Sequence, residues 1–270
     1  MIFPTALTIC VLDSSFALFL FEPDDEADRV MMRLKAVPSF VKRFQLGASS
    51  HDITVATTAA TRKSACSIIW LPAFSESAAS VISHIVEATH QRVNASVVLL
   101  SGVTYLPSDL VEAVDVVVRA CANHCALIQS MVNGITHSRQ GIDVHYLNDV
   151  LTGQQGRWYA AVTEAQGSSR ALDAITSALK LLETSLSDGA TISCFLLVIS
   201  GNNIKISERQ DIRRKLISRT ATNCFYLESN FDDESMGDSI QVTLLCLEQI
   251  STRQSKPWLS ATWRHTTRYC

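Results

Sequence analysis

The chain alternates between short apolar runs and longer amphipathic runs, and this order constrains its fold more than any other feature. Residues 66–71 are apolar and partly β-branched, residues 75–93 repeat apolar side chains at helical spacing, and residues 95–103 are apolar again. A strand–helix–strand order of this kind is typical of parallel strands joined by crossover helices. The sequence therefore predicts an α/β fold with helices flanking a parallel sheet.

The other expected elements follow the same two patterns. Strands are expected at 5–12, 16–23, 156–167, 189–201, 223–232 and 238–248. Helices are expected at 24–37, within 45–63, and at 108–135, 168–186 and 207–220. Ser108 and Ser207 are the expected N-caps and Gly134 the expected helix stop. Because the 108–135 helix is long and apolar, we expect it to cross the middle of the molecule and join two halves.

Composition excludes several classes of function. Hydrophobic residues make up 47% and charged residues 18% of the 270 residues, which is typical of a packed chain rather than a disordered one. The net charge is −3, and the absence of a long basic run argues against nucleic-acid binding. Only 10 residues are glycine, so several glycine-rich phosphate loops are not expected.

The cysteines and the first residues bear on the cellular compartment. Cys10, Cys66, Cys194 and Cys246 lie in strand-like runs, and the irregular spacing of all eight cysteines favours a reduced, cytoplasmic protein. Residues 1–21 are apolar but have no basic start, so we interpret them as two core strands, with a signal sequence as the alternative. No run reaches the ~20 apolar residues of a membrane helix, so no transmembrane segment is expected.

The stretch "SIIWLPAFSESAAS" (67–80) occupies the kind of strand-to-helix junction where α/β proteins bind nucleotide phosphates. Such junctions are normally rich in glycine, because the backbone must approach the anion. This one has no glycine and carries Leu71, Phe74 and Glu76 instead. Glu76 would repel a phosphate charge by about 1–4 kcal/mol at ~4 Å. The stretch therefore predicts that no phosphate binds here.

Three stretches of the second half are similar to one known family. They are "TEAQGSSRA" (163–171), "DGATISCFLLVISGNNIKIS" (188–207) and "DDESMGDSIQVTLLCL" (232–247). They resemble the Gly-Glu-Ala-x-Gly-x-x-Arg-Ala segment, the Gly-Ala…Gly-Gly…Leu-x-Leu-x-Glu stretch and the Asp-Glu-x-x-Gly-Asp-x-Ile-x-Val-Thr strand entry of FtsZ, the bacterial relative of tubulin. The resemblance covers 156–248, the region of the FtsZ C-terminal domain.

The resemblance implies an α/β fold of the tubulin/FtsZ superfamily. Its parts would be a reduced Rossmann-like N-terminal domain (1–107), a central helix with a connecting loop (108–151), a mixed-sheet FtsZ-type C-terminal domain (152–250) and a tail (251–270). FtsZ has a Gly-Gly-Gly-Thr-Gly-Thr-Gly loop where this chain has "PAFSESAAS" (72–80), and its other phosphate loop has no counterpart at "DSSF" (13–16).

FtsZ also inserts an Asn-x-Asp-x-x-Asp loop from one subunit into the nucleotide pocket of the next. The resemblance places its counterpart at 140–146, "QGIDVHY". Asp143 stands for the first carboxylate and Tyr146 replaces the second, unless Asp149 is a displaced carboxylate.

These observations predict a non-catalytic FtsZ-like pseudo-GTPase that acts through protein–protein association, as a filament-forming or scaffolding component. No catalytic, cofactor-binding or metal-binding residue is expected. The partner would be another protein or a second copy of the chain. The candidate interface residues are Leu71, Phe74, Glu76, Asp143 and Tyr146. The alternative is a nucleotide-binding or other small-ligand-binding protein that uses a remodelled cleft. A further alternative is that the first half is an unrelated domain.

Two other groups of residues have a functional and a structural interpretation. Cys121, His124 and Cys125 lie on adjacent turns of the expected long helix and would hold zinc with His137 or His145, although the apolar face of a central helix explains the cysteines better. The basic residues of 207–220 would bind an acidic partner or form a solvated helix face, and the second is the commoner case. They are Arg209, Arg213, Arg214, Lys215 and Arg219. No Gly-x-Ser-x-Gly motif indicates a hydrolase.

Overall fold

The computed structural model describes residues 6–12, 16–22, 34, 38–46, 50–62, 64–92, 95–102, 106–120, 124–136, 142, 144–152, 157–187, 190–220 and 224–249. The strands of these residues are β1 (Ala6–Leu12), β2 (Phe16–Glu22), β3 (Phe40–Gln45), β4 (Cys66–Leu71), β5 (Ser96–Ser101), β6 (Val116–Ala120), β7 (Arg157–Gln166), β8 (Thr191–Gly201), β9 (Phe225–Asp232) and β10 (Ser239–Gln249). The helices are α2 (Ser50–Thr61), α3 (Glu76–His90), α4 (Ser108–Ala113), α5 (His124–Thr136), α6 (Val144–Thr152), α7 (Arg170–Glu183), α8 (Ile206–Ile217) and the short 3₁₀ turn η1 (Glu234–Met236).

All ten strands form one mixed sheet in the order β3-β1-β2-β4-β5-β6-β7-β10-β8-β9. The run from β2 to β7 is parallel, as the strand–helix alternation predicts. The hairpin β1–β2 and strand β3 are antiparallel additions at one end. At the other end β10 runs antiparallel between β7 and β8, and β9 lies parallel to β8 at the edge. The predicted α/β class with a mixed sheet in the second half is confirmed.

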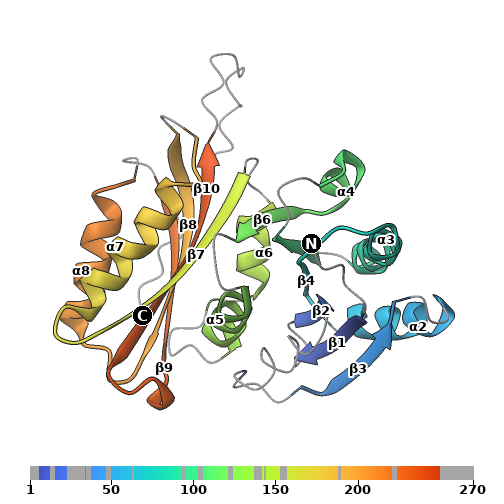
Figure 1. Ribbon diagram of the computed structural model, residues 1–270, viewed down its shortest axis with the longest axis horizontal. Coiled ribbons are helices and arrows are strands. Elements are labelled where there is room, and N and C mark those ends of the chain that lie inside the picture. Colours follow the sequence, from blue (N-terminus) through green and yellow to red (C-terminus); the bar gives the residue numbers. More distant parts are fainter. Residues whose placement is uncertain are drawn as a thin grey trace.

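The helices cover both faces of this sheet (Figure 1). In the first half, α2 and α3 pack on one face, and in the second half α7 and α8 pack on one face. The sheet twists strongly, so α5 lies between the two halves, in the middle of the molecule. No helix among the described residues is long and apolar enough to span a bilayer.

The single long helix predicted for 108–135 is wrong. The described residues there form α4, then β6, then α5. Three consecutive valines, Val116 to Val118, lie in β6, where β-branched side chains pack well on a pleated sheet. The periodicity of an apolar run of this length does not distinguish a buried helix from a buried strand. In the structure this segment is a strand, because it pairs with β5 on one side and β7 on the other. β6 thereby joins the two halves of the sheet.

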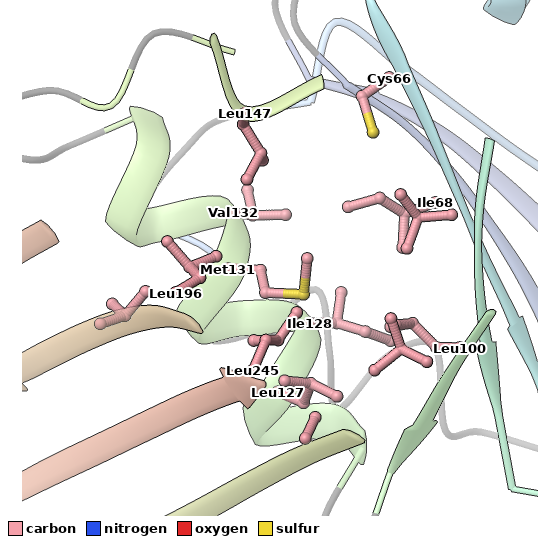
Figure 2. Close-up of a cluster of buried hydrophobic side chains, with 14 of the residues drawn as sticks. Cys66, Ile68, Leu100, Leu127, Ile128, Met131, Val132, Leu147, Leu196 and Leu245 are labelled. Carbon is pink, nitrogen blue, oxygen red and sulfur yellow. The ribbon is translucent and has the colours of Figure 1, made fainter. Parts of the chain in front are cut away.

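The shortened helix α5 still has the central place expected of the long one. Figure 2 shows Ile128, Met131 and Val132 of α5 between the strands of the two halves, which contribute Ile68 on one side and Leu196 on the other. The three α5 side chains are fully buried. Because one apolar cluster spans both halves, burial of α5 stabilises their relative position. The domain limits at 107 and 151 remain a prediction.

Three local predictions need correction. Ser108 is the first residue of α4, whose N-cap is Pro107, and the N-cap of α8 is Lys205 rather than Ser207. Gly134 lies inside α5 instead of ending it. A Cβ at this position would lie 2.6 Å from Cγ1 of Val198 on β8, so glycine lets the helix approach the sheet closely.

Other predictions are confirmed or lie outside the described residues. Cys10, Cys66, Cys194 and Cys246 are buried free thiols in strands, as expected. Burial raises the pKa of Cys10, Cys66 and Cys194 to about 12, so these thiols remain protonated and unreactive. Apart from Leu34, the expected helix at 24–37 falls outside the described residues, as do the turn at 13–15 and the tail beyond 249.

Candidate functional site

The turn from β4 to α3 holds the predicted remains of a nucleotide site. Ser75 is the N-cap of α3 in extended conformation, and its hydroxyl oxygen accepts a hydrogen bond from the N–H of Ala78 at 3.1 Å. The carbonyl of Ser75 accepts from the N–H of Ala79 at 2.9 Å. Two backbone N–H groups of the first turn are therefore already bonded within the chain, and a ligand would have to displace the cap to reach the Ala78 donor.

The three candidate interface residues of this turn have different environments. Leu71 is fully buried in the apolar cluster of α2 and α3, so its side chain offers no surface to a partner. Phe74 is partly buried and packs against the same cluster. Glu76 is exposed at the first residue of α3. Of the three candidate residues, Phe74 and Glu76 therefore present side-chain surface at this turn.

A stacked pair of rings lies on the opposite face of β4. The indole of Trp70 is 4% exposed and stacks on the imidazole of His124, with centroids 3.9 Å apart and planes 9° apart. A Cβ at Gly102, directly after β5, would lie 3.0 Å from the Trp70 ring. The carboxyl ends of β4 and β5, where α/β proteins usually bind ligands, thus hold a bulky aromatic pair.

The predicted counterpart of the inserted FtsZ loop is only partly described. Asp143 lies outside the described residues. Tyr146 lies on α6 and is 46% exposed, and Asp149 is exposed on the same helix. Since α6 packs on the face of the sheet opposite to α2 and α3, the structure does not bring Tyr146 together with Phe74.

Tyr146 belongs instead to an aromatic surface at the edge strand β9. Its ring meets Phe225 edge-on, with centroids 6.2 Å apart, and Phe225 is 40% exposed. On the other side of β9, Tyr226 stacks on the buried ring of Phe195 at 5.3 Å. Ile217, at the end of α8, lines a shallow apolar hollow with Tyr226. We call Tyr146, Ile217, Phe225 and Tyr226 the aromatic edge surface.

Sequence reasoning missed three members of the aromatic edge surface. Phe225 and Tyr226 are two adjacent aromatic residues in a strand, and their side chains point to opposite faces of the sheet. That pattern is compatible with a central strand that is covered on both faces, and equally with an exposed edge strand. Only the strand order, with β9 outermost, shows that these rings are at the rim.

The three FtsZ-like stretches converge on a buried ion pair. Arg170, at the start of α7, is 6% exposed and donates two hydrogen bonds to Glu208, from Nε at 2.7 Å and from a terminal nitrogen at 3.2 Å. It also donates to the carbonyl of Asn202 at 3.2 Å, and Asp238 lies 3.6 Å away. Hydrogen bonds from Arg170 lower the pKa of Glu208, and the same bonds raise the pKa of Arg170. This arrangement ties three loops together.

The basic residues on and just after α8 are largely paired with carboxylates of the chain itself. Arg209 and Arg213 both donate to Glu228 on β9, at 3.1 Å and 2.9 Å. Hydrogen bonding to Glu228 raises the pKa of Arg213. Arg214 pairs with Asp211 on its own helix, and Arg219 pairs with Glu183 on α7.

Of the residues predicted to hold zinc, the structure describes His124, Cys125 and His145. Cys121 and His137 lie outside the described residues. Cys125 is half-buried beside the central cluster, and His124 stacks on Trp70. Among the described residues, no group of three or more His, Cys, Asp or Glu side chains is arranged to hold a metal ion.

Comparison with known proteins gives matches among solved structures alone. No family model and no curated protein matches the chain. A mutant of FtsZ from M. jannaschii matches with 15% identity over 72% of this chain and 60% of its own, at a TM-score of 0.46. GDP-bound CetZ1 from Haloferax volcanii matches with 13% identity over 74% of this chain and 70% of its own, at a TM-score of 0.48.

The chain spans about 60% of the length of the FtsZ structures that it matches. The solved structures similar to this chain include FtsZ and CetZ proteins.

Proposed function

We propose that this chain is a non-catalytic member of the FtsZ-like folds that acts by associating with protein, in the first place with further copies of itself, as a filament-forming or scaffolding component. The observation that carries this proposal is the aromatic edge surface. Three aromatic side chains between 40% and 46% exposed lie at the rim of the sheet, Tyr146 and Phe225 on one face of the edge strand β9 and Tyr226 on the other. Aromatic residues that are already held in place are typical of protein interfaces.

Contacts within the chain hold these rings before any partner arrives. Tyr226 stacks on Phe195, and Phe225 meets Tyr146 edge-on. Rings that are fixed in this way lose little conformational entropy on binding. Beside them β9 is an eight-residue edge strand without lysine or proline, the residues that commonly block pairing at an edge. By contrast, the other edge strand, β3, has exposed Lys42 and Arg43.

The β4–α3 turn supports the non-catalytic part of the proposal. A triphosphate needs several free backbone N–H groups at close range. At this turn Ser75 already binds the N–H of Ala78, every residue has a side chain, and Glu76 adds a negative charge. Nucleotide binding in a remodelled cleft is the alternative, and the first experiment below separates the two.

Two of the matched structures are described as an FtsZ dimer and as a CetZ2 protofilament with GTPγS bound. Those assemblies belong to the matched proteins. For this chain, the proposal that it associates rests on the aromatic edge surface.

The first experiment is a titration of the purified full chain with GTP and GDP, with and without magnesium, by calorimetry. We expect no binding up to millimolar nucleotide. An affinity in the micromolar range, about −8 kcal/mol, would contradict the non-catalytic interpretation and favour the alternative.

The second experiment measures association by sedimentation velocity over a roughly hundredfold concentration range, without nucleotide. We expect the mean mass to rise with concentration. The double variant Tyr146→Ser/Phe225→Ser should weaken association by about tenfold or more, as loss of an interface anchor does. The control is Val55→Ser, which removes a similarly exposed apolar side chain from α2 on another part of the surface. A wild-type chain that stays monomeric, or a double variant that associates like wild type, would refute the proposed surface.

A further inference from the structure

The aromatic edge surface lies at the same end of the sheet as the end of β10, the last described strand. Leu247 on β10 pairs with Cys194 on β8, and Cys194 pairs with Phe225 on β9. β10 ends soon after this row, at Gln249. Because neighbouring strands are about 4.8 Å apart, the chain leaves β10 roughly 10 Å from the strand that carries Phe225 and Tyr226.

Residues 250–270, which follow β10, lie outside the described residues, and their composition differs from that of the rest of the chain. They contain four basic and no acidic residues, and two of the four tryptophans. Their formal charge of +4, set against −3 for the whole chain, leaves −7 for residues 1–249. Opposite charges favour contact between the two parts, and tryptophan is a frequent anchor of protein contacts.

Eight of these residues, 262–269, alternate in the way that a strand with two different faces does. In "TWRHTTRY" every second residue belongs to one row, which includes Trp263 and Tyr269, and the residues between them form a second row, which includes Arg264 and Arg268. A period of two is typical of a β-strand. The segment therefore predicts a strand with an aromatic face and a basic face, and it has the same length as β9.

The two faces of the sheet at β9 differ in a matching way. On the face covered by α6, Asp149 is exposed on the same side of the helix as Tyr146, and its carboxylate has no ion pair among the described residues. On the other face, Arg213 lines the shallow apolar hollow together with Tyr226. The basic row is therefore favoured on the Asp149 face, and the aromatic row is favoured beside the guanidinium of Arg213.

The residues between β10 and this segment, 250–261, are long enough to connect Gln249 with the outer side of β9. The connection crosses β8 and β9, a distance of about 14 Å at the usual strand spacing, and twelve extended residues reach at most about 40 Å. Covalent linkage of this kind gives effective concentrations in the range of about 1 mM. The segment of the same chain is therefore a strong competitor of a second copy for this edge.

We propose that residues 262–269 add to β9 of the same chain as a further edge strand and cover the aromatic edge surface. Main-chain hydrogen bonds to β9 supply the affinity, and the side-chain rows supply the orientation. The aromatic row contacts Tyr226 and Ile217, and the basic row faces Asp149. The regulatory consequence rests on the proposed function: the segment and a second copy compete for β9, so the segment limits self-association.

The test is NMR of the tryptophan indole N–H groups in the isotope-labelled full chain, at the lowest concentration of the sedimentation series. Trp70 and Trp158 are buried and serve as internal references, and the variant Trp263→Phe assigns the signal of Trp263. A synthetic peptide of residues 250–270 gives the signal of the undocked segment. We expect the Trp263 signal of the full chain to differ from that of the peptide. Tyr226→Ser should move it towards the peptide signal, and Val55→Ser on α2 should leave it unchanged.

Two further variants of the full chain test orientation and competition. Asp149→Lys places a positive charge beside the basic row and should also move the Trp263 signal towards that of the peptide. Glu87→Lys makes the same change of charge at an exposed position of α3 and should not move it. Trp263→Ser/Tyr269→Ser removes the anchors of the segment and should strengthen self-association by about fivefold or more in sedimentation velocity, because the edge is then uncovered.

Four outcomes would overturn the proposal. They are that the Trp263 signal coincides with that of the peptide, that Tyr226→Ser leaves it unchanged, that it depends on protein concentration, which would assign the contact to the segment of a second copy, or that Trp263→Ser/Tyr269→Ser associates like wild type. The two proposals fail separately: an undocked segment in a chain that associates refutes only this inference, and a docked segment in a chain whose anchor variant never associates refutes only the proposed function.

Discussion

Ser96 of β5 donates its hydroxyl proton to the carboxamide oxygen of Asn148 on α6, at 2.6 Å. The carboxamide nitrogen of Asn148 donates in turn to the carbonyl of Ala65, just before β4, at 2.8 Å. Both side chains are buried. One side chain thus ties α6 to two neighbouring strands of the first half. Because α6 also carries Tyr146, this link helps to position the aromatic edge surface.

Replacing Asn148 by alanine should destabilise the protein by about 1–3 kcal/mol, because the Ser96 hydroxyl and the Ala65 carbonyl would each lose one buried hydrogen bond. The free energy of unfolding from urea titration measures the effect. Asp149→Ala, at the adjacent exposed position, should change it by less than about 0.5 kcal/mol. Equal effects of the two variants would show that the buried link contributes little.

Gly134→Ala tests the close approach of α5 to β8. In an ordinary helix, alanine is more favourable than glycine by about 1 kcal/mol. Here the added Cβ would lie 2.6 Å from Val198, and we expect a net loss of about 1–3 kcal/mol. Val198→Ala makes room for the methyl group, so the double variant should lose less than the sum of the single variants. A stabilised Gly134→Ala protein would exclude this close packing.

Arg170→Met should destabilise the protein by about 2–4 kcal/mol, since it leaves Glu208 partly buried without its main partner. The double variant Arg170→Met/Glu208→Leu removes both charges and should recover part of the loss. As a control, Arg214→Ala breaks an exposed pair on α8 and should cost less than about 1 kcal/mol. Thermal and urea unfolding of the three variants measure the difference, and a double variant less stable than Arg170→Met would refute the explanation.

The stability of the protein should fall in acid partly through Glu248. Burial by itself raises the pKa of this carboxyl, but hydrogen bonds from the N–H of Ser187, at 2.6 Å, and the hydroxyl of Tyr159, at 3.2 Å, leave the pKa below its ordinary value. A lowered folded-state pKa contributes stability at pH values above the unfolded pKa of about 4.3, and this contribution is lost as the pH falls through the folded-state value.

The variant Glu248→Gln isolates this contribution. It should be less stable than wild type at pH 7, and the difference should shrink as the pH is lowered towards 3. Urea titrations of both proteins at several pH values measure it. A difference that stays constant between pH 7 and pH 3 would mean that ionisation of Glu248 does not contribute.

Particular residues show how far sequence reasoning extends. The strands around Cys66 and Cys194 follow from continuous apolar runs, because these strands are buried on both faces. The helix after Ser75 follows from apolar periodicity, because one face of it is buried. The prediction of one long helix over 108–135 was wrong at Val116, because a short apolar run is compatible with a helix or a strand until its neighbours are known. Tyr146 was selected for its place in a motif. Its contact with Phe225, 79 positions further along the chain, depends on a packing that no local pattern contains.

The sequence by itself determined the α/β alternation, the buried free cysteines and the glycine-free turn at 72–80, because each depends on neighbouring residues or on composition. Tertiary structure alone decided that β6 joins two half-sheets, that β9 is an edge and that Tyr146 meets Phe225 beside it. The physical reason is that strand order and the faces of distant elements are set by the burial of the whole core, which no single segment encodes.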